Sequence, residues 1–94
     1  MSDSLDIVLF DYSFQILNYA IEFLNTPGYS CLRFIDILEK TVNVALKIET
    51  IENKTFYEKI KKKYKERRVM TDTKTREDFL NDLLNLFVDE WKTQ

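Results

Sequence analysis

Glycine and proline are almost absent from this chain, and their scarcity limits what it can fold into. The 94 residues include one glycine and one proline, which are adjacent at Pro27-Gly28. Tight turns and left-handed backbone positions usually need these residues, so an all-β fold with many short hairpins is disfavoured. Proline ends a helix and glycine lets the chain reverse, so we expect a break at residues 25–28 between two long helices.

The stretch from Leu32 to Ile51 has the strongest helical pattern, and the rest of the chain is expected to pack around it. Two apolar seams run along it at spacings of mostly three and four residues. The first seam consists of Cys31, Ile35, Leu38, Val42 and Ala45, and the second of Phe34, Ile37, Val44, Ile48 and Ile51. At ~100° per residue the seams merge into an apolar arc of roughly 200°. Such a helix must be covered on more than one side.

Three further segments have helical periodicity. Residues 4–24 are apolar around most of the helix, apart from one thin polar stripe of Asp11, Gln15, Asn18 and Glu22. Residues 56–68 follow Thr55, which with Glu58 forms a capping-box pattern. Residues 76–91 form the last of these segments. Thr75 is its expected N-cap, and a loop at 69–74 precedes it. In this last helix the residues expected to face the core are Leu80, Leu83, Leu84, Phe87 and Trp91.

These segments predict one all-α domain over residues 1–94, a compact four-helix fold. Residues 4–24 and 32–51, the latter capped by Ser30, form its central antiparallel helix pair, and the other two helices pack across that pair. A chain of this size buries only ~60–65% of its unfolded surface. Because 45% of the residues are hydrophobic, the first two helices carry more apolar surface than two short amphipathic helices can cover. The excess predicts a protein partner, either a second copy or a larger subunit.

Several catalytic chemistries are disfavoured by residue content. The chain has no histidine, which is the commonest general base and metal ligand. Gly28 alone cannot build a phosphate-binding loop. Cys31 near a helix N-terminus is a nucleophile or a packed core residue, and its place on the apolar seam favours packing. Asp78 and Asp82, one helical turn apart, could bind Mg²⁺, but a solvated acidic face is the simpler interpretation. We therefore predict no enzyme, no cofactor, no metal and no small-molecule substrate.

The expected location is cytoplasmic. A single cysteine permits no intrachain disulfide, which suits a reducing compartment. The N-terminal segment carries Asp3, Asp6 and Asp11 through its apolar part and has no basic region, unlike a signal peptide. No apolar run approaches the ~20 residues of a membrane span, so no membrane partner is expected.

Positive charge is concentrated in residues 59–68, which carry seven basic residues and one acid in a chain of net charge −2. A basic helix can bind nucleic-acid phosphates or an acidic partner, and a solvated face near a helix C-terminus is the open alternative. Tyr57 and Tyr64 could stack on bases, but they share an apolar stripe with Ile60 that favours anchoring to the core. The candidate contact residues are Lys59, Lys61, Lys62, Lys63, Lys65 and Arg68.

Two stretches resemble known sequences. Residues 29–36, Tyr-Ser-Cys-Leu-Arg-Phe-Ile-Asp, resemble the central motif of a small, uncharacterised, all-helical family of archaea and bacteria, in which Gly-Pro usually stands at Ser30-Cys31. Residues 69–72, followed by Phe79-Leu80 in an acidic helix, resemble that family's second half. The overall plan is similar in size and style to the small accessory subunits of archaeal B-family DNA polymerases.

The predicted function is a non-catalytic helical interaction subunit of a larger assembly. The resemblance to polymerase subunits implies, most specifically, an accessory subunit of DNA-handling machinery such as a replication complex. The alternative from the charge pattern is a stand-alone protein that binds nucleic acid through residues 59–68 without sequence preference, because a lysine-rich helix lacks the side chains that read base edges.

Overall fold

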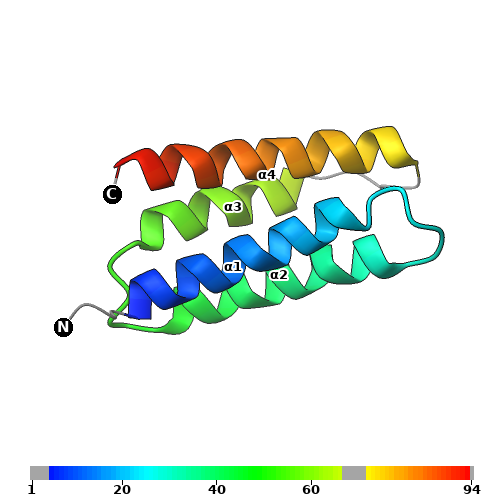
Figure 1. Cartoon of the computed structure of the whole chain (residues 1–94). Coiled ribbons are helices and arrows are strands. Elements are labelled where there is room, and N and C mark those ends of the chain that lie inside the picture. Colours follow the sequence, from blue (N-terminus) through cyan, green and yellow to red (C-terminus); the bar gives the residue numbers. More distant parts are fainter. Residues whose placement is uncertain (1–4, 67–71, 94) are drawn as a thin grey trace.

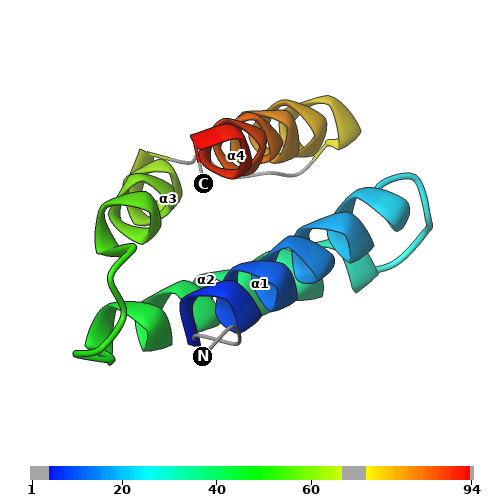
Figure 2. The ribbon, with the colours of Figure 1, turned by 60° about the vertical axis from the view of Figure 1, so that its left-hand side comes forward.

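Four helices run alternately up and down in the computed structural model, which describes residues 5–66 and 72–93 (Figure 1). They are α1 (Leu5–Glu22), α2 (Ser30–Lys47), α3 (Lys54–Glu66) and α4 (Thr73–Thr93). Each helix contacts two others, in the cyclic order α1, α2, α3, α4 and back to α1. Figure 2 shows α1 and α2 as one layer with α3 and α4 above it. The predicted all-α four-helix fold, with its antiparallel α1–α2 pair, is confirmed.

The core is built around an aromatic cluster contributed by three helices. The rings of Phe10 on α1, Phe56 on α3 and Phe87 on α4 lie with centroids 4.9–5.4 Å apart. Rings at these separations and tilts gain edge-to-face attraction in addition to apolar burial. The first seam of α2 closes the other side of the core, and all five of its residues are buried. Of the second seam, Ile37 and Val44 are left exposed, whereas Phe34 and Ile48 pack against the core and Ile51 is buried.

Helix α2 is shorter than predicted. It ends at Lys47, and Ile48 takes an extended conformation with its N–H donating to the carbonyl of Ala45. The prediction of a helix continuing to Ile51 was wrong because Ile51 leaves the helical seam and enters the core, where it is 3% exposed. At the other end Tyr29 is the N-cap and makes no side-chain cap bond, so the expected Ser30 cap was also wrong.

Helix α3 begins at Lys54, two residues earlier than predicted, so Thr55 lies inside the helix and the capping-box interpretation was wrong. A carboxylate from α1 takes the role of the cap. Asp6 Oδ1 accepts hydrogen bonds from the N–H of Glu52 at 3.1 Å and of Asn53 at 2.9 Å. An anion is favourable at this position because the N–H groups at a helix start lack internal partners. The contact joins the first turn of α1 to the start of α3.

Helix α4 begins at Thr73, so Thr75 is not its cap. Asp72 accepts a hydrogen bond from the Thr75 N–H at 2.8 Å. The Thr75 hydroxyl first, and this backbone bond second, lower the pKa of Asp72. Most of the expected core positions of α4 are buried or packed against the core, but Trp91 is 68% exposed, which contradicts its predicted burial. α4 extends along α1 to Thr93, and the ring of Trp91 lies outside the described core. The predicted loop at 69–74 lies mostly outside the described residues.

Candidate functional site

The basic run of residues 59–68 does not form a single face. At 100° per residue its lysines spread around α3, and the buried stripe of Phe56, Tyr57, Ile60 and Tyr64 takes the inner side. Lys63 Nζ lies 4.0 Å from a carboxylate oxygen of Asp82 on α4. Lys59, one turn before Lys63, is exposed. Arg68 lies outside the described residues, so its contact role stays a prediction.

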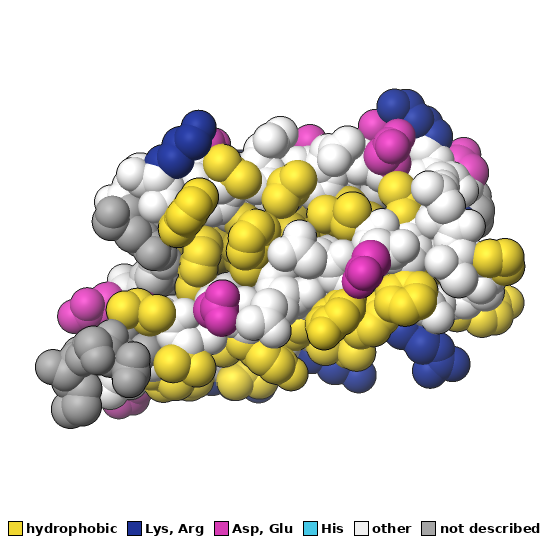
Figure 3. All heavy atoms as spheres, in the orientation of Figure 1, with side chains coloured by type: hydrophobic (Ala, Val, Ile, Leu, Met, Phe, Trp, Pro, Cys, Tyr) yellow, Lys and Arg dark blue, Asp and Glu magenta, His cyan; other side chains and the backbone are white. Residues whose placement is uncertain are grey.

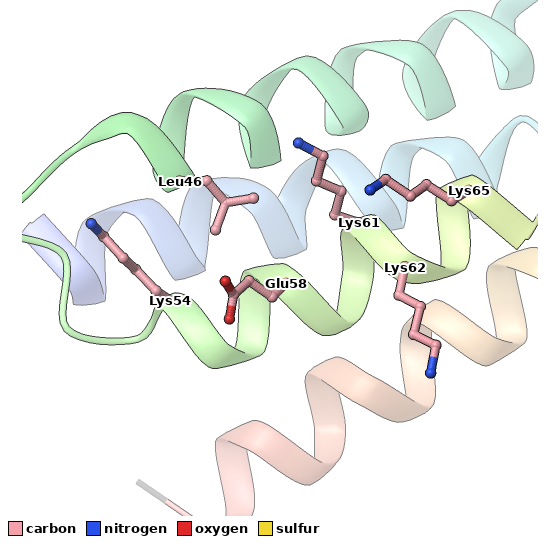
Figure 4. A pocket seen from close by; sticks show the side chains of 6 residues that line it. All are labelled: Leu46, Lys54, Glu58, Lys61, Lys62 and Lys65. Carbon is pink, nitrogen blue, oxygen red and sulfur yellow. The ribbon is translucent and has the colours of Figure 1, made fainter.

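The lysines that point towards α2 line an open cleft between α2 and α3. Figure 4 shows Lys54, Lys61 and Lys65 directed to that side of α3, whereas Lys62 points towards α4. Two adjoining hollows of about 650 and 540 Å³ make up the cleft, and Leu46, Lys61 and Lys65 line both. The larger hollow is lined by Leu46, Lys54, Glu58, Lys61, Lys62 and Lys65. We call this surface the lysine cleft.

The lysine cleft has a positive balance of charge. Lys47 of α2 joins the lysines of α3, while Glu39 and Glu58 supply the negative charges of the lining. Lys54, Lys61 and Lys65 follow one another at spacings of seven and four residues, a stripe of ~16 Å along the helix at 1.5 Å per residue. A row of ammonium groups in an open cleft suits an extended polyanion better than a small ligand.

Two members of the lysine cleft were missed at the sequence level. Lys54 was excluded by the wrong start of α3, although its helical spacing to Lys61 was a usable signal. Lys47 comes from another helix, and only the packing of α2 on α3 brings it to the same cleft. No pattern along the chain connects it to residues 59–68.

The tyrosines of α3 are core residues and cannot stack on bases in this fold. Tyr57 is 0% and Tyr64 4% exposed. The Tyr64 hydroxyl donates to the carbonyl of Ile35 at 2.7 Å, which ties α3 to α2. Tyr57 and Ser13 are fully buried, and within the described structure their hydroxyl oxygens have no hydrogen-bond partner. Burial raises the pKa of Tyr57 to about 12, although the nearby Ser13 hydroxyl acts to lower it.

Asp78 and Cys31, considered above for metal binding and nucleophilic chemistry, have contacts typical of structural residues. Asp78 pairs with Lys74 at 3.1 Å, and this contact raises the pKa of Lys74. Cys31 is 2% exposed, and burial raises the pKa of its thiol, with Arg76 acting in the opposite direction. A buried thiol with a raised pKa is a poor nucleophile. Among residues 5–66 and 72–93, no three His, Cys, Asp or Glu side chains gather as metal ligands.

The outer side of the α1–α2 pair carries a continuous set of exposed apolar side chains, which we call the hairpin face. From α1 it has Val8 (53% exposed), Tyr12 (54%) and Tyr19 (48%), and from α2 it has Ile37 (41%) and Val44 (54%). Phe34 bridges the two helices, because its ring stacks on Tyr19 with centroids 5.4 Å apart. Figure 3 shows this apolar band along the lower edge of the molecule.

A second apolar band lies between α1 and α4 (Figure 3). Trp91 of α4 is 68% exposed and Ile7 of α1 is 56% exposed. A hollow of about 360 Å³ is lined by Asp6, Ile7, Glu52, Asn53 and Glu90. The three acids make this hollow negative, in contrast to the lysine cleft.

Comparisons with known proteins found no family model, curated protein or solved structure that matches this chain. The resemblances noted from the sequence therefore remain predictions. No helix in the described part of the chain is both long and apolar enough to cross a membrane.

Proposed function

We propose that this protein is a non-catalytic interaction subunit that binds a protein partner through the hairpin face. The observation that carries the proposal is the exposure of five large apolar side chains from two packed helices in one band. Contiguous apolar surface of this kind on a small domain marks an interaction site, whereas single exposed apolar residues are ordinary. Tyrosine and branched aliphatic side chains at the centre of such a patch contribute most to the binding free energy, because a partner removes their apolar surface from water.

The hairpin face is also suited to binding by its rigidity. Each of its residues lies on a helix whose opposite side is part of the core, so the side chains are presented on fixed backbone. A partner that covers the face does not have to order a loop first, which lowers the entropic cost of binding. The expected binding mode is helix against helix, with residues three or four positions apart as the contacts.

Nucleic-acid binding through the lysine cleft is the second candidate function. It is favoured by the convergence of Lys54, Lys61 and Lys65 of α3 with Lys47 of α2 on one open cleft. Combined with a partner on the hairpin face, this arrangement supports the more specific proposal of an accessory subunit of DNA-handling machinery. The two surfaces lie on neighbouring sides of α2 and meet at Lys47, which lines the cleft and borders the hairpin face.

The hairpin face is tested by Val44→Arg, with Asn85→Arg as the matched control on the exposed side of α4. Both variants add one arginine at an exposed helical site, so both should fold like the wild type. Tagged wild-type protein, purified from its own cells with nuclease treatment, should retain one stoichiometric protein component, whether a second copy or another chain. Val44→Arg should lose it and Asn85→Arg should keep it. Equal retention by both variants would contradict the proposal.

The lysine cleft is tested by salt dependence. Wild-type protein should bind single- or double-stranded DNA with an affinity that falls with salt, and each lost phosphate contact should lower the slope by roughly 0.7–0.9. The variant Lys54→Glu/Lys61→Glu/Lys65→Glu should lose this binding and retain helicity. Lys59→Glu, outside the cleft, is the control and should change the affinity much less. An affinity insensitive to the triple change would remove the nucleic-acid proposal.

A further inference from the structure

We infer that the partner on the hairpin face is a second copy of this chain, placed by a two-fold axis that runs parallel to the helices. The inference rests on the proposed function and names the partner for the same surface. Its basis is the distribution of charge along the two edges of the hairpin face, which is opposite on α1 and α2.

The edge on α1 is acidic. At 100° per residue, the next side chains around the helix after Tyr12 and Tyr19 are Gln15, Glu22 and Asp11, in that order. Asp11 accepts a hydrogen bond from the Gln15 amide at 3.1 Å, and its carboxylate stays on the surface. No basic residue lies on α1.

The edge on α2 is basic on balance. Arg33, Lys40 and Lys47 recur every seven residues, next to Ile37 and Val44 around the helix. All three are exposed. Asp36 lies on the same edge, one turn from Arg33 and from Lys40, and leaves three basic residues against one acid. Figure 3 shows the lower apolar band with acidic side chains on the α1 side above it and basic side chains at its lower edge. The hairpin face is thus an apolar strip with a negative border and a positive border.

Two-fold symmetry allows two simple ways to place such a face on a copy of itself. An axis across the helices sets α1 against α1, which brings acidic edge to acidic edge and basic edge to basic edge. An axis parallel to the helices sets α1 of one copy against α2 of the other, so both borders meet the opposite charge. Only the second arrangement is complementary, and it places each helix antiparallel to the helix that faces it.

The heights of the charges agree with this axis. The stacked pairs Tyr19–Phe34 and Phe23–Phe34 set the register between α1 and α2. Counting from them, Asp11 lies level with residues 42–46 of α2, within reach of Lys40 and Lys47. Glu22 lies level with residues 31–35, beside Arg33. A two-fold axis parallel to the helices leaves these heights nearly unchanged between copies, so the same pairs meet across the interface.

The size of the face suits a modest homodimer. Two helices of 18 residues each are ~27 Å long and together ~20 Å wide, a projected area of roughly 550 Å² per copy. Specific interfaces bury about 600–1,000 Å² per partner, so this face lies just below that range, where weak and transient complexes are found. A dissociation constant in the micromolar range is expected for such an interface.

Sedimentation of the purified chain supplies the first readout. The wild type should sediment with twice the 11.3 kDa mass of the chain at micromolar concentration. Val44→Arg should weaken the dimer at least tenfold, whereas Asn85→Arg should leave it unchanged. A dimer that tolerates Val44→Arg would overturn the inference, because it would use another surface.

Charge reversal supplies the decisive test of the axis. Asp11→Lys/Glu22→Lys makes both borders basic, so this variant alone should be monomeric. Adding Arg33→Glu/Lys40→Glu to the same chain exchanges the two borders. With an axis parallel to the helices, this fourfold variant should form its own dimer with an affinity within a few-fold of the wild type and should not pair with the wild type. With an axis across the helices, it would instead pair with the wild type, because each helix would face its own counterpart of opposite charge, and that result would overturn the proposed arrangement.

The outcomes separate this inference from the proposed function. A monomeric wild type at these concentrations would reject the second copy. If the monomeric wild type still retains a stoichiometric cellular protein, and Val44→Arg loses that protein, the hairpin face remains an interaction site for a different protein. If neither the dimer nor any Val44-dependent partner is found, both the inference and the proposed function fail.

Discussion

The two seams of α2 differ in burial although they are similar in chemistry. Ile35 and Val42 of the first seam are each 1% exposed, whereas Ile37 and Val44 of the second are 41% and 54% exposed. Ile35 and Ile37 are the same residue type two positions apart, and so are Val42 and Val44. At 100° per residue the two members of each pair lie on sides of the helix ~200° apart. The first seam meets the aromatic cluster, whereas Ile37 and Val44 face outwards beside α1. The same side chain is therefore a folding residue on one side and a candidate binding residue on the other.

The largest expected effect comes from comparing Phe87→Ala with Trp91→Ala, one turn apart on α4. Phe87 is 0% exposed and stacks or tilts against three other rings, so its removal should destabilise the domain by ~3–5 kcal/mol. Trp91 is 68% exposed, and its loss should change the unfolding free energy by about 0.5 kcal/mol or less. Urea unfolding of both variants measures the difference, and a similar loss in both would refute the assignment of Trp91 to the surface.

A closer test of the comparison uses identical substitutions on the two seams. Ile35→Ala should cost ~2–5 kcal/mol, because it leaves a cavity in the core. Ile37→Ala should cost about 0.5 kcal/mol or less in folding of the monomer, measured in dilute protein. At higher concentration Ile37→Ala should reduce self-association instead. Equal destabilisation by both substitutions in dilute solution would mean that the second seam is buried within the monomer.

The smallest effect at neutral pH is expected for Tyr57→Phe, which removes a buried hydroxyl without a hydrogen-bond partner in the described structure. The change should be neutral or stabilising by ~1 kcal/mol in urea unfolding, because no hydrogen bond is lost and a buried polar group is removed. A clear loss of stability would show that the hydroxyl is hydrogen-bonded in solution.

Tyr57→Phe should have a clearer effect in alkali. The pKa of Tyr57 is about 12 in the folded chain, above the ~10 of an unfolded tyrosine. Above pH ~10 the unfolded phenol releases its proton first, so stability falls until the pH passes about 12. Replacing Tyr57 should remove this loss and shift alkaline unfolding to higher pH, measured by circular dichroism. Tyr12→Phe on the exposed hairpin face is the control and should leave the midpoint where it is.

Helix content and core periodicity were accessible from the sequence, whereas helix ends were less so. The buried stripe of α3 and the first seam of α2 follow from spacing, because each places every member on one side of a helix. The start of α3 could not be predicted, because its capping anion, Asp6, comes from α1, far along the chain. The end of α2 depends on Ile51 entering the core, which is a tertiary contact.

The sequence alone determined that the chain is helical, where it breaks, and that its apolar surface exceeds what one thin core accepts. These properties are local or additive: a lack of glycine and proline, a 3.6-residue period and a count of apolar side chains. Only the tertiary structure decided which apolar seam is exposed, which lysines share a cleft and which borders carry opposite charge. Those properties depend on the distance and orientation between helices, since Lys47 and Lys61, or Tyr19 and Phe34, become neighbours only when α1, α2 and α3 pack.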